Sequence, residues 1–370
     1  MNITSAWYKV NTDIIDSPAL LVYPVRIKEN IFYLKHWVKN ISLIRPHVKT
    51  HKMLEVVELM LQEGIFKFKC ATIAEAEMLA IAGAEDVLLA YQPVGPKIDR
   101  LCLLVQNFPG TKFSCLVDNN GQARAIGDKF SEKKLTIEVY IDLNVGMNRT
   151  GIKPGKEALD LYLEIDQIEG LKARGLHVYD GHIRDQDFEV RKQKCDAAFK
   201  SVEELVSALL NEGKENPVVI AGGSPTFPIH ARRGDVECSP GTFIFWDWGY
   251  HVGLPELKFK IAALVITRII SIIDKNLICL DLGHKAIAAE NPFPRVHFLN
   301  LPEAESISQS EEHLVVKIAD SSGLSLGDVL YGVPYHICPT CALYDSAYII
   351  DNEDVVSSWK VISRNRSIHI

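Results

Sequence analysis

A lysine at the end of an apolar run is the first residue in this sequence whose position needs a chemical explanation. Lys49 stands in the segment RPHVKTHK, residues 45–52, which is unusually rich in polar groups for the exit of a strand. An ammonium group is costly to bury, and a desolvated lysine with a lowered pKa is the group that Schiff-base chemistry uses. The alternative is a solvated loop lysine, and this residue alone does not decide between the two.

The second candidate is a glycine turn that could hold an anion. Gly222, Gly223 and Ser224 open the segment GGSPT, and Gly241 and Thr242 form a second such corner. Glycines let backbone N–H groups approach an anion, and hydroxyl groups can donate hydrogen bonds to phosphate oxygens. Two plain turns are the alternative. A Schiff-base lysine and a phosphate-binding turn on one face of a barrel together indicate pyridoxal phosphate.

Short apolar runs alternate with amphipathic stretches and must position these groups. Residues 73–82, for example, have their apolar side chains at helical spacing. Short β-branched runs separated by helices predict parallel strands that are buried on both faces. Eight such units predict a closed (β/α)8 TIM barrel, with an open doubly wound sheet as the alternative. The expected strands are 19–23, 43–48, 67–72, 86–91, 112–117, 135–144, 171–178 and 217–221. The turn at Gly222 would then follow the eighth strand, where barrels commonly bind phosphate.

The pattern changes after about Trp248. Apolar runs there alternate with turn signals and contain no clear long helix, which predicts a second, mostly antiparallel β-domain. We therefore expect a barrel over residues 18–248 and a β-domain over residues 1–17 and 249–370.

Composition excludes several classes of protein. The chain has 370 residues, 47% of them hydrophobic, and a formal net charge of -7. It has no basic stripe, so we expect no nucleic-acid partner and no anionic membrane partner. The start of the sequence lacks the features of a signal peptide, and no apolar run is long enough to span a bilayer. The eight cysteines are scattered, most of them in apolar runs, which is typical of a reduced, cytoplasmic protein.

Two segments resemble the opening of a known family. SPALL, residues 17–21, and RPHVKTHK, residues 45–52, are similar to the D-threonine aldolase and D-serine dehydratase family. That family belongs to the fold-type III, alanine-racemase-like enzymes that bind pyridoxal phosphate. The resemblance runs from about Asp16 to the region of Cys338 and implies that Lys49 forms the Schiff base with the cofactor.

The same resemblance suggests further cofactor contacts. Arg149, in GMNRTG, matches the arginine that reaches the phenolic oxygen of the cofactor in alanine racemases. Tyr179 falls where those racemases place a ring against the pyridine, and His182 is a nearby competitor. The phosphate site implied by the resemblance consists of Gly222, Gly223, Ser224, Gly241 and Thr242.

A metal motif is implied in the β-domain. The segment PYHICPT, residues 334–340, is similar to the metal motif of the family. On an extended segment, His336 and Cys338 would face the same side and could share one metal. Imidazole and thiolate suit zinc, while manganese and magnesium stay open. Cys338 and Cys341 also form a C-x-x-C, which could be a redox pair or half of a zinc knuckle.

The resemblance implies a lyase that acts on a small D-amino acid carrying a 3-hydroxyl group. The reaction would be dehydration and deamination of D-serine or D-threonine, or aldol cleavage of D-threonine to glycine and acetaldehyde. Cysteine at position 338 favours the dehydratase branch. Racemisation is disfavoured because it needs two bases and only Lys49 is evident, and a non-catalytic pyridoxal-phosphate carrier is a further alternative. The resemblance also implies a homodimer.

Overall fold

The computed structural model describes residues 7–370, which form two compact units. The first six residues, part of the segment 1–17 assigned to the β-domain, lie outside the described residues. One unit contains residues up to Tyr33 together with 50–53 and 242–364, and the other contains residues 34–49, 54–241 and 365–370. Neither border coincides with the predicted division at residues 17 and 248, because the chain passes between the units several times.

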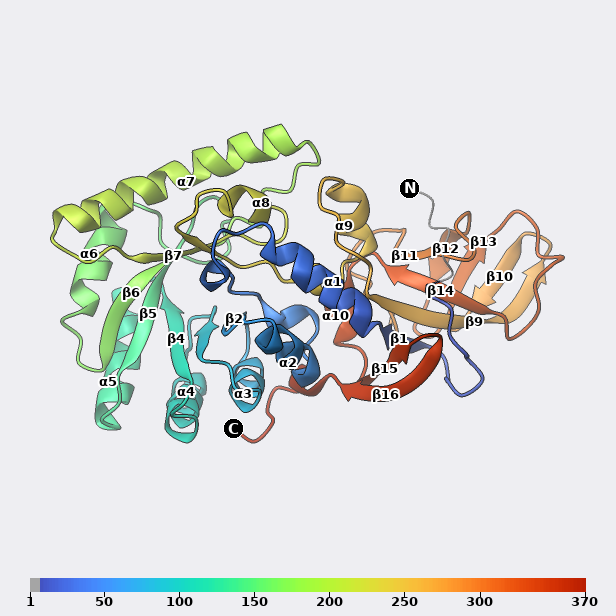
Figure 1. The fold of residues 1–370 in the computed structure, drawn as a ribbon, viewed down its shortest axis with the longest axis horizontal. Helices are drawn as coiled ribbons and strands as arrows, with labels where there is room; N and C mark the ends of the chain where they lie inside the picture. The colour runs from blue at the N-terminus through green and yellow to red at the C-terminus, as the bar shows by residue number, and fades with distance from the viewer. Residues whose placement is uncertain (1–6) are drawn as a thin grey trace. The chain divides into compact units, whose positions relative to one another are not determined.

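The second unit is built on a seven-stranded parallel sheet in the order β2-β3-β4-β5-β6-β7-β8 (Figure 1). The strands are mostly buried and apolar, as a sheet covered by helices requires. Their bounds are β2 Lys67–Cys70, β3 Asp86–Leu89, β4 Lys112–Val117, β5 Ile137–Leu143, β6 Leu171–Val178, β7 Val218–Ala221 and β8 Val236–Cys238. The helices between them are α2 Leu54–Gln62, α3 Ile73–Ile81, α4 Pro96–Asn107, α5 Asn120–Glu132, α6 Lys156–Ile165, α7 Phe188–Asn211 and α8 Phe227–His230.

An extended segment closes this sheet into a barrel. Ile44 forms a parallel bridge with Cys238 of β8, and His47 forms one with Lys69 of β2. Backbone hydrogen bonds from Arg45 N–H to the Cys238 carbonyl and from Lys69 N–H to the Pro46 carbonyl, 2.9 and 2.8 Å long, support the closure. The predicted barrel is therefore confirmed, with this segment as its first strand.

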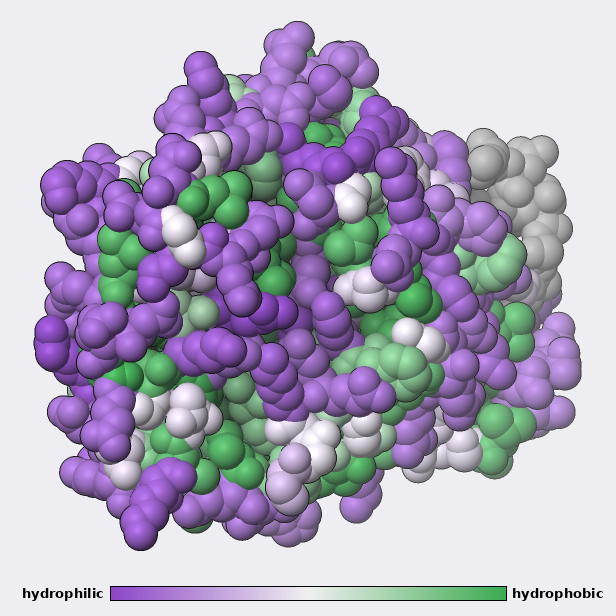
Figure 2. All heavy atoms as spheres, turned by 60° about the vertical axis from the view of Figure 1, so that its left-hand side comes forward, coloured by the Kyte–Doolittle hydropathy of each residue, from purple (hydrophilic) through white to green (hydrophobic). Residues whose placement is uncertain are grey.

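The barrel helices begin where their sequences supply caps. The side chain of Thr72 accepts a hydrogen bond from the Glu75 N–H, while the Glu75 carboxylate accepts one from the Ala71 N–H. This reciprocal capping box satisfies two N–H groups that the first turn of α3 leaves unpaired. The outward faces of the helices are largely hydrophilic, with smaller hydrophobic patches between them (Figure 2).

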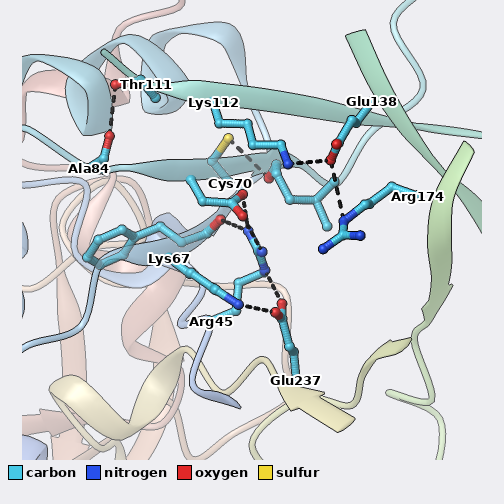
Figure 3. Close-up of polar contacts among 12 residues, drawn as sticks. Arg45, Lys67, Cys70, Ala84, Thr111, Lys112, Glu138, Arg174 and Glu237 are labelled. Carbon is cyan, nitrogen blue, oxygen red and sulfur yellow. Dashed lines mark hydrogen bonds and ion pairs between the residues drawn. The ribbon is translucent and has the colours of Figure 1, made fainter. Parts of the chain in front are cut away.

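The floor of the barrel is held by a buried arginine. Arg45 is 1% exposed and forms an ion pair with Asp86 at 2.7 Å and another with Glu237 at 2.6 Å (Figure 3). Lys67 forms a second ion pair with Glu237. Burial alone would raise the pKa of Asp86, but hydrogen bonds and charge from Arg45 outweigh it and lower that pKa. The network joins the closing segment, β2, β3 and β8 at one end of the sheet.

The first unit is a mixed sheet, mostly antiparallel as predicted, in the order β12-β13-β10-β9-β1-β15-β16, with β14 paired to β9 and β11. Its strands are β1 Ala19–Val22, β9 Ala263–Asp274, β10 Leu277–Leu280, β11 Val296–Phe298, β12 Glu305–Gln309, β13 Leu314–Lys317, β14 Val329–Pro334, β15 Ser346–Asp351 and β16 Asp354–Lys360. Its helices include α9 Trp248–Gly253 and α10 Ile337–Cys341, and α1 Pro24–Lys35 follows β1.

Strand β1 corrects the prediction that residues 19–23 form the first barrel strand. β1 pairs antiparallel with β9 and parallel with β15, so it belongs to this sheet. The eighth barrel position is instead occupied by β8, which was not predicted. The turn at Gly222 consequently follows the seventh strand in chain order, β7.

Candidate active site

Lys49 lies just beyond the closing segment of the barrel, in the 3₁₀ turn Val48–Thr50. The segment runs parallel to β2 and β8, so Lys49 stands at the edge of the sheet where the parallel strands end. Its backbone N–H donates to Nδ1 of His47 at 3.1 Å, and its side chain is half-buried between Val48 and Thr50, which are both fully buried. Active-site residues of closed barrels come from this edge.

The glycine turn lies at the same edge, after β7. Gly222 has a positive φ of 78°, and Ser224 is 5% exposed. The Gly223 N–H donates to the hydroxyl of Thr226 at 3.3 Å, and that hydroxyl donates to Asp180 at 2.7 Å. A Cβ atom added at Gly222 would lie 2.9 Å from Thr226 Oγ1. The turn therefore has a fixed shape that requires glycine.

Asp180 contacts this turn through the hydroxyl of Thr226. It was not among the predicted site residues. Its carboxylate is 2.8 Å from Nε2 of His230 and 3.6 Å from Sγ of Cys195. Burial alone would raise the pKa of Asp180, but hydrogen bonds from His230 and Thr226 outweigh it and lower that pKa. Among the described residues, Asp180, Cys195 and His230 are also a buried trio of potential metal ligands.

The second phosphate corner follows β8. The Ser239 N–H donates to the carbonyl of Ala221 at 3.2 Å, and the His47 N–H donates to the carbonyl of Pro240 at 3.0 Å. Gly241 therefore ends a segment that lies between the glycine turn and the segment leading to Lys49. Thr242 is next in sequence and belongs to the other unit, where its hydroxyl lies 3.6 Å from Sγ of Cys338.

Tyr179, at the end of β6, links two predicted contacts. The guanidinium carbon of Arg149 lies 4.6 Å from the centre of the Tyr179 ring. A Cβ atom added at Gly223 would lie 3.4 Å from the same ring. The structure thus brings Arg149, Tyr179 and the glycine turn together. His182 lies against Gly146, whose added Cβ would be 2.8 Å from Nε2 of His182.

The predicted metal pair also comes together, although not on an extended segment. His336 is the N-cap residue of α10, and Cys338 lies in the first turn of that helix. A hydrogen bond joins their side chains, and Nδ1 of His336 lies 2.5 Å from Glu290. Burial lowers the pKa of His336, but Cys338 and Glu290 outweigh it and raise that pKa to about 9. The hydroxyl of Thr50 lies 3.1 Å from Sγ of Cys338.

The donor atoms fit the groups that the sequence implied. An imidazole, a thiol and a neighbouring carboxylate form a donor set that zinc accepts. Neither Cys338 nor Cys341 of the C-x-x-C is in a disulfide bond, and Cys341 is buried. At the barrel edge, the amine of Lys49, a glycine turn that carries the Ser224 hydroxyl, and the guanidinium of Arg149 fit an aldehyde cofactor with an anionic phosphate.

Comparison with known proteins agrees with this geometry. The family model for the alanine racemase N-terminal domain matches residues 24–247, and a serine dehydratase domain matches residues 262–350. D-threonine aldolase of Arthrobacter sp is 25% identical over 95% of this chain and 94% of its own length. 3-Hydroxy-D-aspartate aldolase of Paracoccus denitrificans is 27% identical over 95% of this chain and 93% of its own length.

Solved structures place the fold in the same group. The crystal structure of D-threonine aldolase from Filomicrobium marinum has a TM-score of 0.88 and 27% identity, and each chain is 95% covered. D-threo-3-hydroxyaspartate dehydratase from Delftia sp. HT23 has a TM-score of 0.80 and 22% identity, over 94% of this chain and 97% of its own. Other structures of that dehydratase are a histidine-to-alanine variant and a metal-free cysteine-to-alanine variant.

The fold and the residues at the barrel edge define an alanine-racemase-like protein with a separate β-domain. The chain belongs to the family of the alanine racemase N-terminal domain. Because its full-length relatives are aldolases and dehydratases, it is an enzyme of the pyridoxal-phosphate lyase type, as predicted. Among the described residues, no helix is both long and apolar enough to cross a membrane.

Proposed function

We propose that this chain is a pyridoxal-phosphate- and metal-dependent lyase for D-3-hydroxy amino acids. It would dehydrate and deaminate D-serine or D-threonine, or cleave D-threonine to glycine and acetaldehyde. The observation that carries the proposal is the position of Lys49 and of the glycine turn, which both follow strands at one edge of the parallel sheet. The cofactor would be bound by the barrel, most of which lies within residues 34–241.

The barrel residues would have distinct tasks. The Lys49 amine would bind the cofactor aldehyde, and once freed it would accept the α-proton, which requires a pKa near the working pH. The turn at Gly222, Gly223 and Ser224 would hold the phosphate, with the Ser224 hydroxyl as a donor. Arg149 would pair with the phenolic oxygen beside the Tyr179 ring. When bound, the cofactor supplies an electron sink for the substrate carbon.

The β-domain would hold the metal through His336 and Cys338. These two residues would hold a divalent ion, with zinc as the first choice, which would supply Lewis-acid chemistry for the 3-hydroxyl group. The contact between His336 and Cys338 supports this assignment. We also propose that the protein is a homodimer and that it is cytoplasmic.

Relatives of other kinds match less of the chain. The alanine racemase of Clostridium perfringens strain ATCC 13124 aligns with 38% of this chain, whereas the aldolases and the 3-hydroxyaspartate dehydratase align with 94–95%. A racemase or a non-catalytic carrier also leaves unexplained the serine dehydratase domain match over residues 262–350. The full-length relatives include both aldolases and dehydratases, so the choice between the two reactions falls to experiment.

Product analysis tests the proposal directly. The apoprotein is reconstituted with pyridoxal phosphate and either zinc or manganese, and then given D-serine, D-threonine or their L-enantiomers. Ammonia with an oxo acid identifies dehydration, and glycine with acetaldehyde identifies aldol cleavage. No product from any D-3-hydroxy amino acid, despite bound cofactor, would favour the carrier.

Two variants test the assigned residues. Borohydride reduction followed by peptide mapping should place the cofactor on Lys49, and Lys49→Ala should lose this label and the activity. Lys156→Ala, which removes a lysine that is 85% exposed on α6, is the matched control and should keep both. His336→Ala should keep the label but lose most of its bound metal. Full activity in Lys49→Ala would refute the proposal.

A further inference from the structure

The buried carboxylate of Asp180 connects the end of a barrel strand to the short helix that follows the glycine turn. Asp180 lies two residues after β6 and is 2% exposed. One of its oxygens accepts a hydrogen bond from the hydroxyl of Thr226 at 2.7 Å, and the other lies 2.8 Å from Nε2 of His230. Thr226 is the N-cap of α8, and His230 is its last residue. Asp180 therefore contacts both ends of this helix.

Asp180, Cys195 and His230 are potential metal ligands, but their contacts favour a hydrogen-bonded cluster. The 2.8 Å between the Asp180 carboxylate and Nε2 of His230 is a hydrogen-bond distance. A metal on Nε2 would move the ring proton to Nδ1, which is buried and has no hydrogen-bond partner within residues 7–370. A buried N–H without an acceptor costs free energy. A ring proton on Nε2, donated to Asp180, avoids this cost.

The hydroxyl of Thr226 serves the glycine turn rather than the helix that it begins. An N-cap threonine usually accepts a hydrogen bond from the first helical turn, but Thr226 accepts none there from any described residue. Its oxygen instead accepts a hydrogen bond from the Gly223 N–H at 3.3 Å. A hydroxyl has a single proton, and this one is donated to Asp180. Asp180 therefore fixes the orientation in which the hydroxyl accepts from Gly223.

The two partners of Asp180 also pack against the turn. A Cβ atom added at Gly222 would lie 2.9 Å from Oγ1 of Thr226 and 2.9 Å from Cδ2 of His230. Glycine is therefore needed to let both side chains approach the backbone this closely. The Gly222 N–H is also engaged by the protein, because it donates to the carbonyl of Val178 at 2.9 Å. The shape of the turn thus depends on groups inside the barrel.

We propose that Asp180 is a positioning residue that holds the turn of residues 222–224 in the shape that binds the cofactor phosphate. It acts through the side chains of Thr226 and His230. This inference rests on the proposed function, which assigns the phosphate to this turn. Thr226 holds the N–H of the residue before Ser224, whose hydroxyl would donate to the phosphate. A turn without this support would have to be ordered on binding, and that ordering would lower the affinity.

Two substitutions interrupt the connection between Asp180 and the turn. Asp180→Asn replaces one acceptor oxygen by a donor, so it can accept a hydrogen bond from Thr226 or from His230 but not from both. Thr226→Val removes the hydroxyl and keeps the shape of the side chain, whereas Thr226→Ser keeps the hydroxyl. Thr111→Val is the matched control. Thr111 is also buried, and its hydroxyl donates to the carbonyl of Ala84 at 2.8 Å, directly before β4.

The readout compares two ligands that differ in the phosphate group. The apoprotein is titrated with pyridoxal phosphate and with pyridoxal, and each dissociation constant is obtained from the absorbance of the bound ligand. Asp180→Asn and Thr226→Val should each weaken the affinity for pyridoxal phosphate by about tenfold, the effect of losing one hydrogen bond. The affinity for pyridoxal should stay at the wild-type value, because pyridoxal places no phosphate in the turn. Thr226→Ser and Thr111→Val should bind both ligands as the wild type does.

The outcomes separate this inference from the function on which it rests. Equal losses of affinity for the two ligands would indicate a general structural role and would overturn the inference. Unchanged affinity for pyridoxal phosphate in Asp180→Asn would also overturn it. Failure of the wild type to attach pyridoxal phosphate at Lys49 overturns the proposed function and this inference together. If Asp180→Asn does not fold, the comparison of Thr226→Val with Thr226→Ser decides, because only the second keeps the hydroxyl that links Asp180 to the turn.

Discussion

Removing the Arg45 side chain should destabilise the barrel far more than removing an exposed arginine of the same sheet. Arg45 donates to Glu237 at 2.6 Å and to both oxygens of Asp86, at 2.7 and 2.9 Å. Arg45→Met would leave these carboxylates without their main partner at the barrel floor. Breaking a buried ion pair from one side costs about 3–5 kcal/mol.

The cost should lie at the lower end of that range. Glu237 keeps its ion pair with Lys67, and the Asp86 side chain is 22% exposed, so water can solvate part of it. We expect a loss of about 3 kcal/mol, which corresponds to a factor of about 150 in the folding equilibrium. Arg174 forms a longer pair with Glu138, 3.5 Å, and its side chain is 39% exposed. Arg174→Met should therefore cost less than about 1 kcal/mol.

Urea denaturation at pH 7, followed by circular dichroism, measures both variants. If the two units unfold separately, the transition that contains the barrel is the relevant one. The triple variant Arg45→Met, Asp86→Asn, Glu237→Gln should recover part of the lost free energy, because it leaves no carboxylate at the barrel floor without its arginine. Equal losses for Arg45→Met and Arg174→Met would refute the argument that burial decides the cost.

Two further predictions concern the glycine turn and a buried histidine. Gly222→Ala should weaken cofactor binding, measured by titration with pyridoxal phosphate, because the added Cβ clashes with His230 and Thr226. Gly213→Ala is the control for backbone strain, because Gly213 has a similar φ of 76° but no neighbour within 4 Å. This control should leave the affinity unchanged. Burial lowers the pKa of His51 to about 3. Below about pH 6.5 the unfolded chain binds a proton at His51, whereas the native state does not. The free energy of unfolding should therefore be unaffected by His51 above that pH and should fall by about 1 kcal/mol per pH unit from there toward pH 3. Urea midpoints of His51→Gln should vary less over this range than those of the wild type or of His284→Gln.

The barrel was predictable from the sequence because most of its strands are continuous apolar runs between amphipathic helices. The same criterion assigned residues 19–23 to the barrel, since a short apolar run looks alike in a parallel and in a mixed sheet. Its partners, β9 and β15, lie more than 200 residues away in sequence. Strand β8 was missed because it has only three residues and contains Glu237. That glutamate is buried because Arg45 faces it, which the local sequence does not reveal.

The residues proposed for the site could be picked out from the sequence only in part, for a similar reason. Lys49, Arg149 and the glycine turn stand in local motifs, and the structure places Lys49 and the turn at the same edge of the sheet. Asp180 has no such signal, because its partners Thr226 and His230 lie about 50 residues further along the chain.

The structure explains why polar residues are so dense in the segment RPHVKTHK. Two of its cations, Arg45 and Lys49, lie four residues apart: Arg45 is in the extended segment, and Lys49 is in the 3₁₀ turn that follows it. Arg45 is fixed at the floor by two carboxylates, and Lys49 is carried to the edge where the parallel strands end. The floor ion pairs therefore also set the register of the stretch, and with it the depth at which the Lys49 amine stands. A one-residue slip would turn Arg45 to the other face of the extended segment, away from its two carboxylates, and would displace Lys49 along the barrel, so the ion pairs of Arg45 help to fix the position of Lys49.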